Sequence, residues 1–233
     1  TTPDWVVVPE ALSAAAGMHR FVWDLRGALP KELESRSGSM RGANGPWAPP
    51  GRYTARLTAF GQTLTRPLVV VKDPRLPSTI TDGDLVQQHE LAREILAERV
   101  RVAAAQKQAT DLRTQIAARR KDAPALVRDA LGVFAKAVTR AAGPPLVSAG
   151  DEDWDIEEIE PTTLRRLATS LAGLQSAVES ADAAPTPDAR TGFAERRKMV
   201  EEGLARWRDV VATERPRVDK ALASAGLTPL KID

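Results

Sequence analysis

The densest set of chemically capable side chains is an acidic run, DEDWDIEE, that begins at Asp151. Asp151, Asp153 and Asp155 fall at positions one, three and five of a calcium-loop pattern, where carboxylate oxygens are the ligands that this cation prefers. The glycine that an EF-hand needs next is replaced by Ile156, and the bidentate glutamate is replaced by Thr162. The pattern excludes an EF-hand and leaves two interpretations, a surface calcium site on the three aspartates or a solvated acidic loop. Apart from calcium, the sequence indicates no cofactor.

The other common catalytic patterns are missing from the sequence. There are 2 histidines and no cysteine. His89-Glu90 begins like a zinc-protease helix, but the second histidine of that motif is Arg93. No phosphate-binding loop and no nucleophile elbow occurs. We therefore predict that this chain is not an enzyme by itself. A pair of carboxylates that converge in space, as in a glycoside hydrolase, stays open as an alternative.

Two tryptophans are candidate ligand-binding residues, Trp47 and Trp5. Trp47 lies in a connection over 26–50 that is rich in glycine and proline, and connections of this length are often functional. If either ring is exposed, it could stack on a sugar or anchor a partner protein. The alternative is structural, with the connection crossing between two sheets and Trp47 filling the core.

The composition changes near residue 75, which indicates two architectures. The first 77 residues hold six of the ten aromatic residues and nine of the 17 prolines. Alternating apolar residues predict strands over 19–25, 51–57 and 63–71, and Trp5 opens a further β-branched run. A turn around Gly61 joins the last two strands into a hairpin, in which Pro67 must lie at an edge or a bulge.

From residue 81 the apolar spacing becomes helical. It predicts one long helix that ends near 121, a second over 124–143 and a third over 161–178. Thr81 or Asp82 can cap the first of these helices. A fourth begins after Pro187 and is interrupted at Pro216, beyond which a short turn or kinked extension follows.

These elements predict an α+β protein of two domains. The first is a small β-sandwich over 1–75, and a hinge over 76–81 follows it. An antiparallel bundle of about four helices occupies 82–233, with the acidic loop at 144–161.

The charge and composition of the chain limit its partners. The net charge is +2, from 33 basic and 31 acidic residues. Because these numbers nearly balance, we do not expect nucleic acid as a partner. No stretch is apolar enough to predict a membrane span. The chain begins at Thr1 without methionine or a leader, and we interpret it as a processed protein or a piece of a longer one.

Several strings resemble the C-terminal region of large bacterial proteins known as sortilin-like or BNR-repeat glycosyl hydrolases. They are GMHRFVWDLR at 17–26, GPWAPPGRYTARL at 45–57, VVVKDPR at 69–75, SADAAPT at 180–186 and AGLTPL at 225–230. In those proteins a β-propeller precedes an immunoglobulin-like, FlgD-like domain, so the resemblance implies that fold for the predicted β-sandwich.

The resemblance implies structural roles for four residues of that domain, Trp23, Asp24, Gly51 and Tyr53. It carries over no catalytic residue. It implies export to the periplasm or the cell exterior, and a non-catalytic accessory module that positions domains or binds a partner. The expected partners are the N-terminal β-propeller of the parent protein, another exported protein or a glycan. The alternative function is a carbohydrate-binding module that uses an exposed tryptophan.

Overall fold

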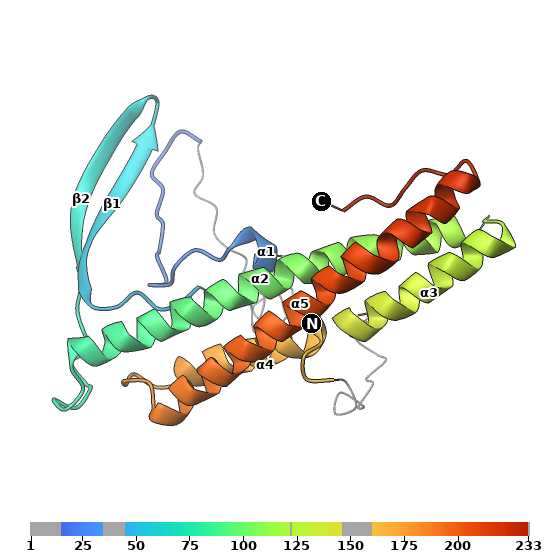
Figure 1. The fold of residues 1–233 in the computed structure, drawn as a ribbon. Helices are drawn as coiled ribbons and strands as arrows, with labels where there is room; N and C mark the ends of the chain where they lie inside the picture. The colour runs from blue at the N-terminus through green and yellow to red at the C-terminus, as the bar shows by residue number, and fades with distance from the viewer. Residues whose placement is uncertain (1–14, 35–44, 122, 146–159, 233) are drawn as a thin grey trace, which may run out of the picture. The chain divides into compact units, whose positions relative to one another are not determined.

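The structure is a computed structural model, and it describes residues 15–34, 45–121, 123–145 and 160–232. Helices account for 59% of these residues. The elements are the short helix α1 (Lys31–Glu34), strands β1 (Gly51–Ala59) and β2 (Gln62–Val70), and four longer helices (Figure 1). Those helices are α2 (Asp82–Arg120), α3 (Ala125–Ala142), α4 (Leu164–Val178) and α5 (Pro187–Ser224).

The prediction of an immunoglobulin-like, FlgD-like β-sandwich is wrong. Among the described residues, regular strand pairing is confined to a single two-stranded antiparallel sheet made by β1 and β2. The strand expected over 19–25 does not form, and Phe21 and Leu25 are exposed there. Trp47 does not fill a core between two sheets, because the residues that the structure describes contain one sheet, β1 with β2. The run beginning at Trp5 lies outside the described residues.

The hairpin itself follows the sequence closely. Gly51 pairs with Val70, and the register continues without a bulge to Ala59 opposite Gln62. Phe60 and Gly61 form the turn with φ angles of 50° and 74°. Positive φ at both central residues is the signature of a type I′ turn, whose twist matches that of the strands.

Contacts divide the chain into two compact units. The hairpin unit comprises Thr1–Arg93 and Glu179–Pro185, and the bundle unit comprises Glu94–Val178 and Thr186–Asp233. The boundary therefore falls inside α2, and the short connection between α4 and α5 belongs with the hairpin. Each unit is described by itself below.

Local capping explains where two helices begin. The Thr81 hydroxyl accepts a hydrogen bond from the Asp84 backbone N–H at 3.2 Å, and the Asp84 carboxylate accepts one from the Thr81 N–H at 2.8 Å. This reciprocal pair is a capping box, and it confirms Thr81 as the cap of α2. The Thr81 backbone N–H, and then the Thr81 hydroxyl, donate to the Asp84 carboxylate and lower the pKa of that carboxyl. At α5, Thr186 accepts from the Ala189 N–H and Pro187 occupies the first turn.

Pro216 does not interrupt α5, in contrast to the prediction. The helix continues from Pro187 to Ser224 with Pro216 inside it. Val218 and Leu222, beyond the proline, are buried at 3% and 0% exposure. Burial of these apolar side chains offsets the loss of one backbone hydrogen bond at the proline.

In the bundle unit, α5 packs against both α3 and α4 (Figure 1). Each of these helices buries apolar residues of the stripe that the sequence predicted. The side chains that are at most 3% exposed include Ile95, Val102 and Leu112 of α2, Leu131, Phe134 and Val138 of α3, Leu164, Leu167 and Leu171 of α4, and Val200 and Trp207 of α5.

At Gly203 of α5, the Thr162 backbone and the Leu167 side chain come so close that any added side chain would force its neighbours to shift. A Cβ at Gly203 would lie 2.5 Å from the Thr162 carbonyl oxygen and 2.6 Å from Leu167 Cδ1. We expect Gly203→Ala to lower the free energy of unfolding by about 1–3 kcal/mol, because the neighbouring backbone must shift. Gly173→Ala in α4 is the matched control, since nothing lies within 4 Å of its Cβ position. It should stabilise the protein by about 0.5–1 kcal/mol through helix propensity. Denaturant unfolding measures both, and two stabilising alanines would contradict the packing.

Candidate interaction site

A corner of the hairpin unit is built around Trp47. The backbones of Arg26 and Trp47 form an isolated antiparallel bridge. The Gly27 N–H donates to the Pro46 carbonyl at 2.9 Å on one side, and the Ala48 N–H donates to the Leu25 carbonyl at 2.7 Å on the other. These bonds hold residues 25–27 beside residues 46–48, and they fix the backbone position of Trp47.

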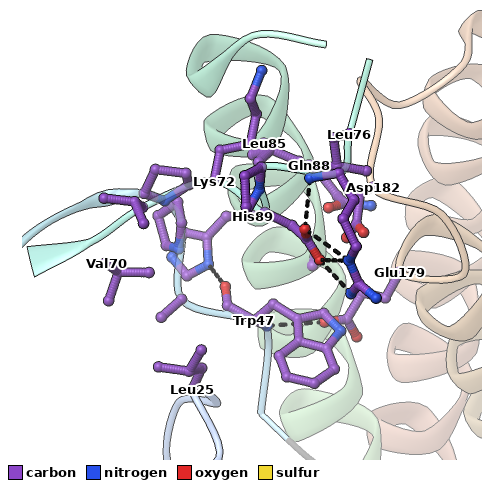
Figure 2. Close-up of a pocket in the computed structure, with 18 residues that line it drawn as sticks. Leu25, Trp47, Val70, Lys72, Leu76, Leu85, Gln88, His89, Glu179 and Asp182 are labelled. Atoms are coloured by element: carbon purple, nitrogen blue, oxygen red, sulfur yellow. Dashed lines mark hydrogen bonds and ion pairs between the residues drawn. The ribbon is translucent and has the colours of Figure 1, made fainter. Parts of the chain in front are cut away.

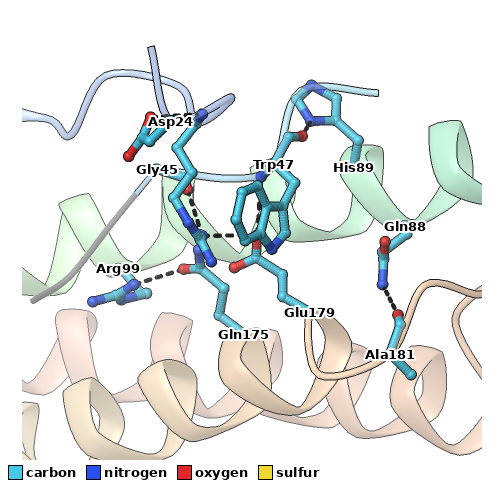
Figure 3. Close-up of polar contacts among 10 residues, drawn as sticks. Asp24, Gly45, Trp47, Gln88, His89, Arg99, Gln175, Glu179 and Ala181 are labelled. Carbon is cyan, nitrogen blue, oxygen red and sulfur yellow. Dashed lines mark hydrogen bonds and ion pairs between the residues drawn. The ribbon is translucent and has the colours of Figure 1, made fainter. Parts of the chain in front are cut away.

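Glu179 anchors this corner from the connection that follows α4 (Figure 3). Its carboxylate accepts a hydrogen bond from the Trp47 backbone N–H at 3.1 Å and pairs with the Arg26 guanidinium at 3.5 Å. The side chains of Glu179 and Arg26 are only 9% and 19% exposed. The Arg26 guanidinium also lies 3.7 Å from the centre of the Trp47 ring, a cation–π contact that covers one face of the indole.

His89 of α2 completes the corner. Its Nδ1 lies 2.6 Å from the Trp47 carbonyl oxygen (Figure 2). Because a carbonyl only accepts, Nδ1 carries the proton of this bond, and Nε2 is the ring nitrogen left for other contacts. Gln88, the residue before His89 in α2, donates from its side-chain amide to the Ala181 carbonyl, which lies in the connection Glu179–Pro185. Thus both Trp47 and that connection are tied to α2.

These groups border an open pocket of about 500 Å³ (Figure 2). Its walls are mainly apolar, and they include Leu25, Pro49, Val70, Leu76 and Leu85 beside the half-exposed Trp47. A pocket of this size and lining is typical of a site that receives an apolar group.

Most of the charged groups around the pocket are bonded to the chain itself. Lys72 donates to the Ile80 carbonyl, and Asp73 pairs with Arg75 at 2.6 Å. The exception is Asp182, which lines the pocket and has no hydrogen bond or ion pair within the described ranges. The arrangement therefore offers an apolar surface with one available carboxylate and the His89 Nε2 atom.

The Asp73–Arg75 pair gives a testable titration. Side-chain hydrogen bonds from Arg75, and then its backbone N–H, lower the pKa of the Asp73 carboxyl from 3.8 to about 2. Because the pKa is lowered on folding, the stabilisation from this group is present above pH 3.8 and is lost as the pH falls through about 2. In Arg75→Ala, we expect the pKa to rise toward 3.8 without reaching it, since the backbone N–H remains. NMR titration of the carboxyl carbon tests this, and an unchanged midpoint would contradict it.

The hairpin offers a second surface in the same unit. Opposite residues of an antiparallel pair share a face, so Tyr53 and Leu57 of β1 lie on the same side as Leu68 and Leu64 of β2. Leu57, Leu64 and Leu68 are 50%, 63% and 40% exposed. At the tip, Phe60 is fully exposed. We name Leu57, Phe60, Leu64 and Leu68 the hairpin patch.

The structure places the four residues of expected structural role near the base of the hairpin. Trp23 meets Tyr53 edge to face, with ring centres 5.7 Å apart. The Trp23 indole donates to the Arg26 carbonyl at 2.8 Å, and Asp24 accepts from the Arg26 N–H at 2.9 Å. Tyr53 donates its hydroxyl proton to the Pro49 carbonyl, just before Gly51 opens β1. The two rings pack against each other but not inside a two-sheet core.

Of the residues predicted to bind a ligand or metal, only Trp47 lies in the described part of the chain. Trp5 lies outside it, as do Asp151, Asp153 and Asp155. Within the residues that the structure does describe, no cluster of three or more histidine, cysteine or acidic side chains could hold a metal ion.

Sequence reasoning missed Glu179 and the Arg26 contact to Trp47. Glu179 lies 132 residues from Trp47 and 153 residues from Arg26 along the chain. A pattern of neighbouring residues in the sequence cannot predict a contact over such a separation. The sequence around His89 matches only an incomplete zinc motif, whereas in the structure His89 holds the Trp47 carbonyl.

Comparisons with protein families, with curated proteins and with solved structures found no match to this chain. None of the described helices is long and apolar enough to cross a membrane.

Proposed function

We propose that this chain is a non-catalytic protein-interaction module and that the hairpin patch is its partner-binding surface. The observation that carries the proposal is the exposure of an apolar sheet face. Leu57 and Leu64 are directly opposite each other, and both are at least half exposed. A two-stranded ribbon is marginally stable on its own and needs a further layer or strand. A partner that covers this face would supply that layer.

Phe60 supports the same proposal. Its φ of 50° is a left-handed conformation that non-glycine residues seldom adopt, and asparagine or glycine usually occupies such a turn. The turn therefore gains nothing from an aromatic side chain, and water fully surrounds the ring. An exposed aromatic residue at the tip of a hairpin is suited to insert into a partner.

The contacts of the pocket support binding rather than proton transfer. Glu179 is bonded to Arg26 and to a backbone N–H, and His89 is bonded to a backbone carbonyl. Groups held in this way position Trp47. We infer that they are structural rather than catalytic.

We further propose that the module belongs to the C-terminal part of a larger exported protein with a β-propeller. The support is the resemblance of the strings at 17–26 and 45–57 to sortilin-like and BNR-repeat proteins. The β-propeller of the same protein is then the first partner to test, and another exported protein is the second.

A pair of matched double variants tests the hairpin patch. The complex is measured as the apparent size of the native protein in an extract of its own cells, by size-exclusion chromatography with antibody detection. We expect the double variant Leu57→Asn with Leu64→Asn to lose the complex, so that its apparent size falls to that of the free chain. The control is Leu126→Asn with Val133→Asn, which replaces two apolar residues of α3 that are 75% and 61% exposed. It should leave the complex intact. Equal behaviour of the two double variants would overturn the assignment of the surface.

A carbohydrate-binding module is the second candidate, and the exposure of Trp47 favours it. Trp47 is 40% exposed, Arg26 lies over one face of its ring, and the Asp182 carboxylate lines the same pocket. A pocket that contains an exposed aromatic ring and a carboxylate suits a sugar. Screening a glycan array with the wild type and Trp47→Ala tests this function. Binding that Trp47→Ala abolishes would support it, and an array without signal would reject it.

A further inference from the structure

The free edge of β1 has the features of a site for strand addition. We infer that β1 pairs with an extended segment of a partner protein in which acidic and apolar residues alternate. This inference rests on the proposed function, because it names the kind of partner that the hairpin binds. It depends on three properties of the hairpin: the direction of its backbone groups, the position of its proline and its charge.

The type I′ turn decides which backbone groups of β1 face outward. Ala59 and Gln62 flank the turn and form its closing hydrogen-bonded pair. Hydrogen-bonded and non-hydrogen-bonded pairs alternate along an antiparallel ladder. The backbone N–H and C=O groups of Arg52, Thr54 and Arg56 therefore point away from β2.

These outward groups are available within the described part of the chain. The sheet there has two strands, and no backbone hydrogen bond joins β1 to another segment. Residues 19–25, for which the sequence predicted a strand, also make no backbone hydrogen bond to β1. Trp23 touches Tyr53 through its side chain only.

The two edges of the hairpin differ because of Pro67. Pro67 lies opposite Thr54 and so occupies a non-hydrogen-bonded position of β2. Its missing N–H is one that would have pointed outward, so the proline costs the ladder nothing and interrupts the free edge of β2. β1 has no proline between Gly51 and Ala59. A proline on an edge strand is a device by which natural proteins prevent pairing, so pairing is obstructed at the edge of β2 and not at the edge of β1.

The charge of the hairpin indicates the chemistry of the partner. The two strands contain Arg52, Arg56 and Arg66 and no acidic residue. Arg52 and Arg56 lie on the same face of β1, are exposed, and have no carboxylate partner among the described residues. An added strand would place every second side chain opposite these arginines and the others beside Leu57. Acidic residues suit the first set and apolar residues suit the second.

A second copy of this chain fits the edge poorly. Two β1 strands that paired with each other would bring arginines of both copies onto one face. Like charges on directly opposed strands are destabilising. The same charges therefore favour an acidic partner and disfavour self-association.

The experiment titrates the full chain with a synthetic extended peptide in which glutamate alternates with valine. A peptide in which lysine alternates with valine has the same strand propensity and the opposite charge. Amide hydrogen exchange and chemical shifts are followed by NMR. We expect the glutamate peptide alone to bind and to protect the N–H groups of Thr54 and Arg56. The N–H groups of Thr63 and Thr65 on β2 should not change.

Two proline variants identify the edge. Thr54→Pro removes an outward N–H of β1 and mirrors the natural Pro67 across the ladder. We expect it to weaken binding of the glutamate peptide about tenfold or more, since an outward hydrogen bond is lost and the ring obstructs the edge. Thr65→Pro removes an outward N–H of β2 and should leave binding unchanged. Retained dispersion of the hairpin signals in each variant shows that the hairpin still folds.

Each other outcome overturns the inference. Equal binding of both peptides would reject the charge argument, and a larger loss in Thr65→Pro would assign binding to the other edge. Protection of Thr54 and Arg56 in the free chain would mean that residues 19–25 or another copy already occupies β1. If neither peptide binds while the double variant at Leu57 and Leu64 still loses its native complex, the partner uses the apolar face, and the proposed function stands without strand addition.

Discussion

Replacing Glu179 with alanine is expected to detach Trp47 from its corner and to lower the free energy of unfolding of the hairpin unit by about 2–4 kcal/mol. The variant leaves the Arg26 guanidinium, which is mostly buried, without its carboxylate. It also removes the acceptor of the Trp47 backbone N–H. Loss of one partner from a buried ion pair costs more than the pair contributes, because the remaining charge stays away from water.

Exchange of the Trp47 backbone amide with solvent measures this effect directly. We expect it to accelerate strongly in Glu179→Ala and less in Glu179→Gln, whose amide oxygen can still accept the hydrogen bond. Asp182→Ala is the matched control from the same connection, because Asp182 is exposed and has no partner in the described part of the chain. Similar exchange in Glu179→Ala and Asp182→Ala would contradict the role of the buried carboxylate.

Replacing Leu230 with alanine is expected to lower the free energy of unfolding of the bundle unit by about 2–5 kcal/mol, the range for a large apolar side chain removed from a core. Leu230 follows the last helix and is only 1% exposed. Its N–H donates to Asp219 and its carbonyl accepts from Arg215, both at 2.8 Å. The side-chain amide of Gln115 in α2 holds the next residue, Lys231. It accepts from the Lys231 backbone N–H at 2.9 Å and donates to the Lys231 carbonyl at 2.8 Å.

Leu227→Ala is the matched control for Leu230, since Leu227 lies in the same tail and is 37% exposed. It should change the stability by less than about 1 kcal/mol. Denaturant unfolding of the full chain compares the two variants. Equal losses would show that the tail does not depend on Leu230 for its attachment.

The helices could be predicted from sequence because their information is local. Apolar residues at helical spacing, such as Leu164, Leu167 and Leu171, define a face that must be buried. Caps and breakers then set the ends. Pro216 was the exception, because a proline that normally ends a helix is tolerated when apolar residues after it are buried.

The prediction of the hairpin was correct and the prediction of a strand over 19–25 was wrong, and both outcomes have a physical cause. The hairpin was predicted because its turn and its register are set by neighbouring residues. The strand over 19–25 was not found because period-two spacing says which residues could share a face, whereas a strand forms only with another strand beside it. Phe21 and Leu25 share such a spacing, but they are 59% and 41% exposed.

The candidate site was only partly accessible from sequence. Trp47 could be selected because it is an aromatic residue in a long connection. Its contacts to Glu179 and His89 join segments that are far apart in the sequence. The spacing of residues along the chain does not predict such contacts. The apolar face of the hairpin was visible in the alternation of Tyr53, Ala55 and Leu57. That this face stays exposed could be learned only from the structure.

The most direct test of the proposed interaction is site-specific photo-crosslinking at Phe60 in the cells that make the protein. A photoreactive phenylalanine analogue replaces Phe60 at the tip of the hairpin, and in a control strain it replaces Leu126 of α3, which is also highly exposed. We predict a single crosslinked protein at Phe60, absent at Leu126 and lost when Leu57 and Leu64 are changed to asparagine. No crosslink at Phe60, or the same crosslinks at both positions, would contradict the account.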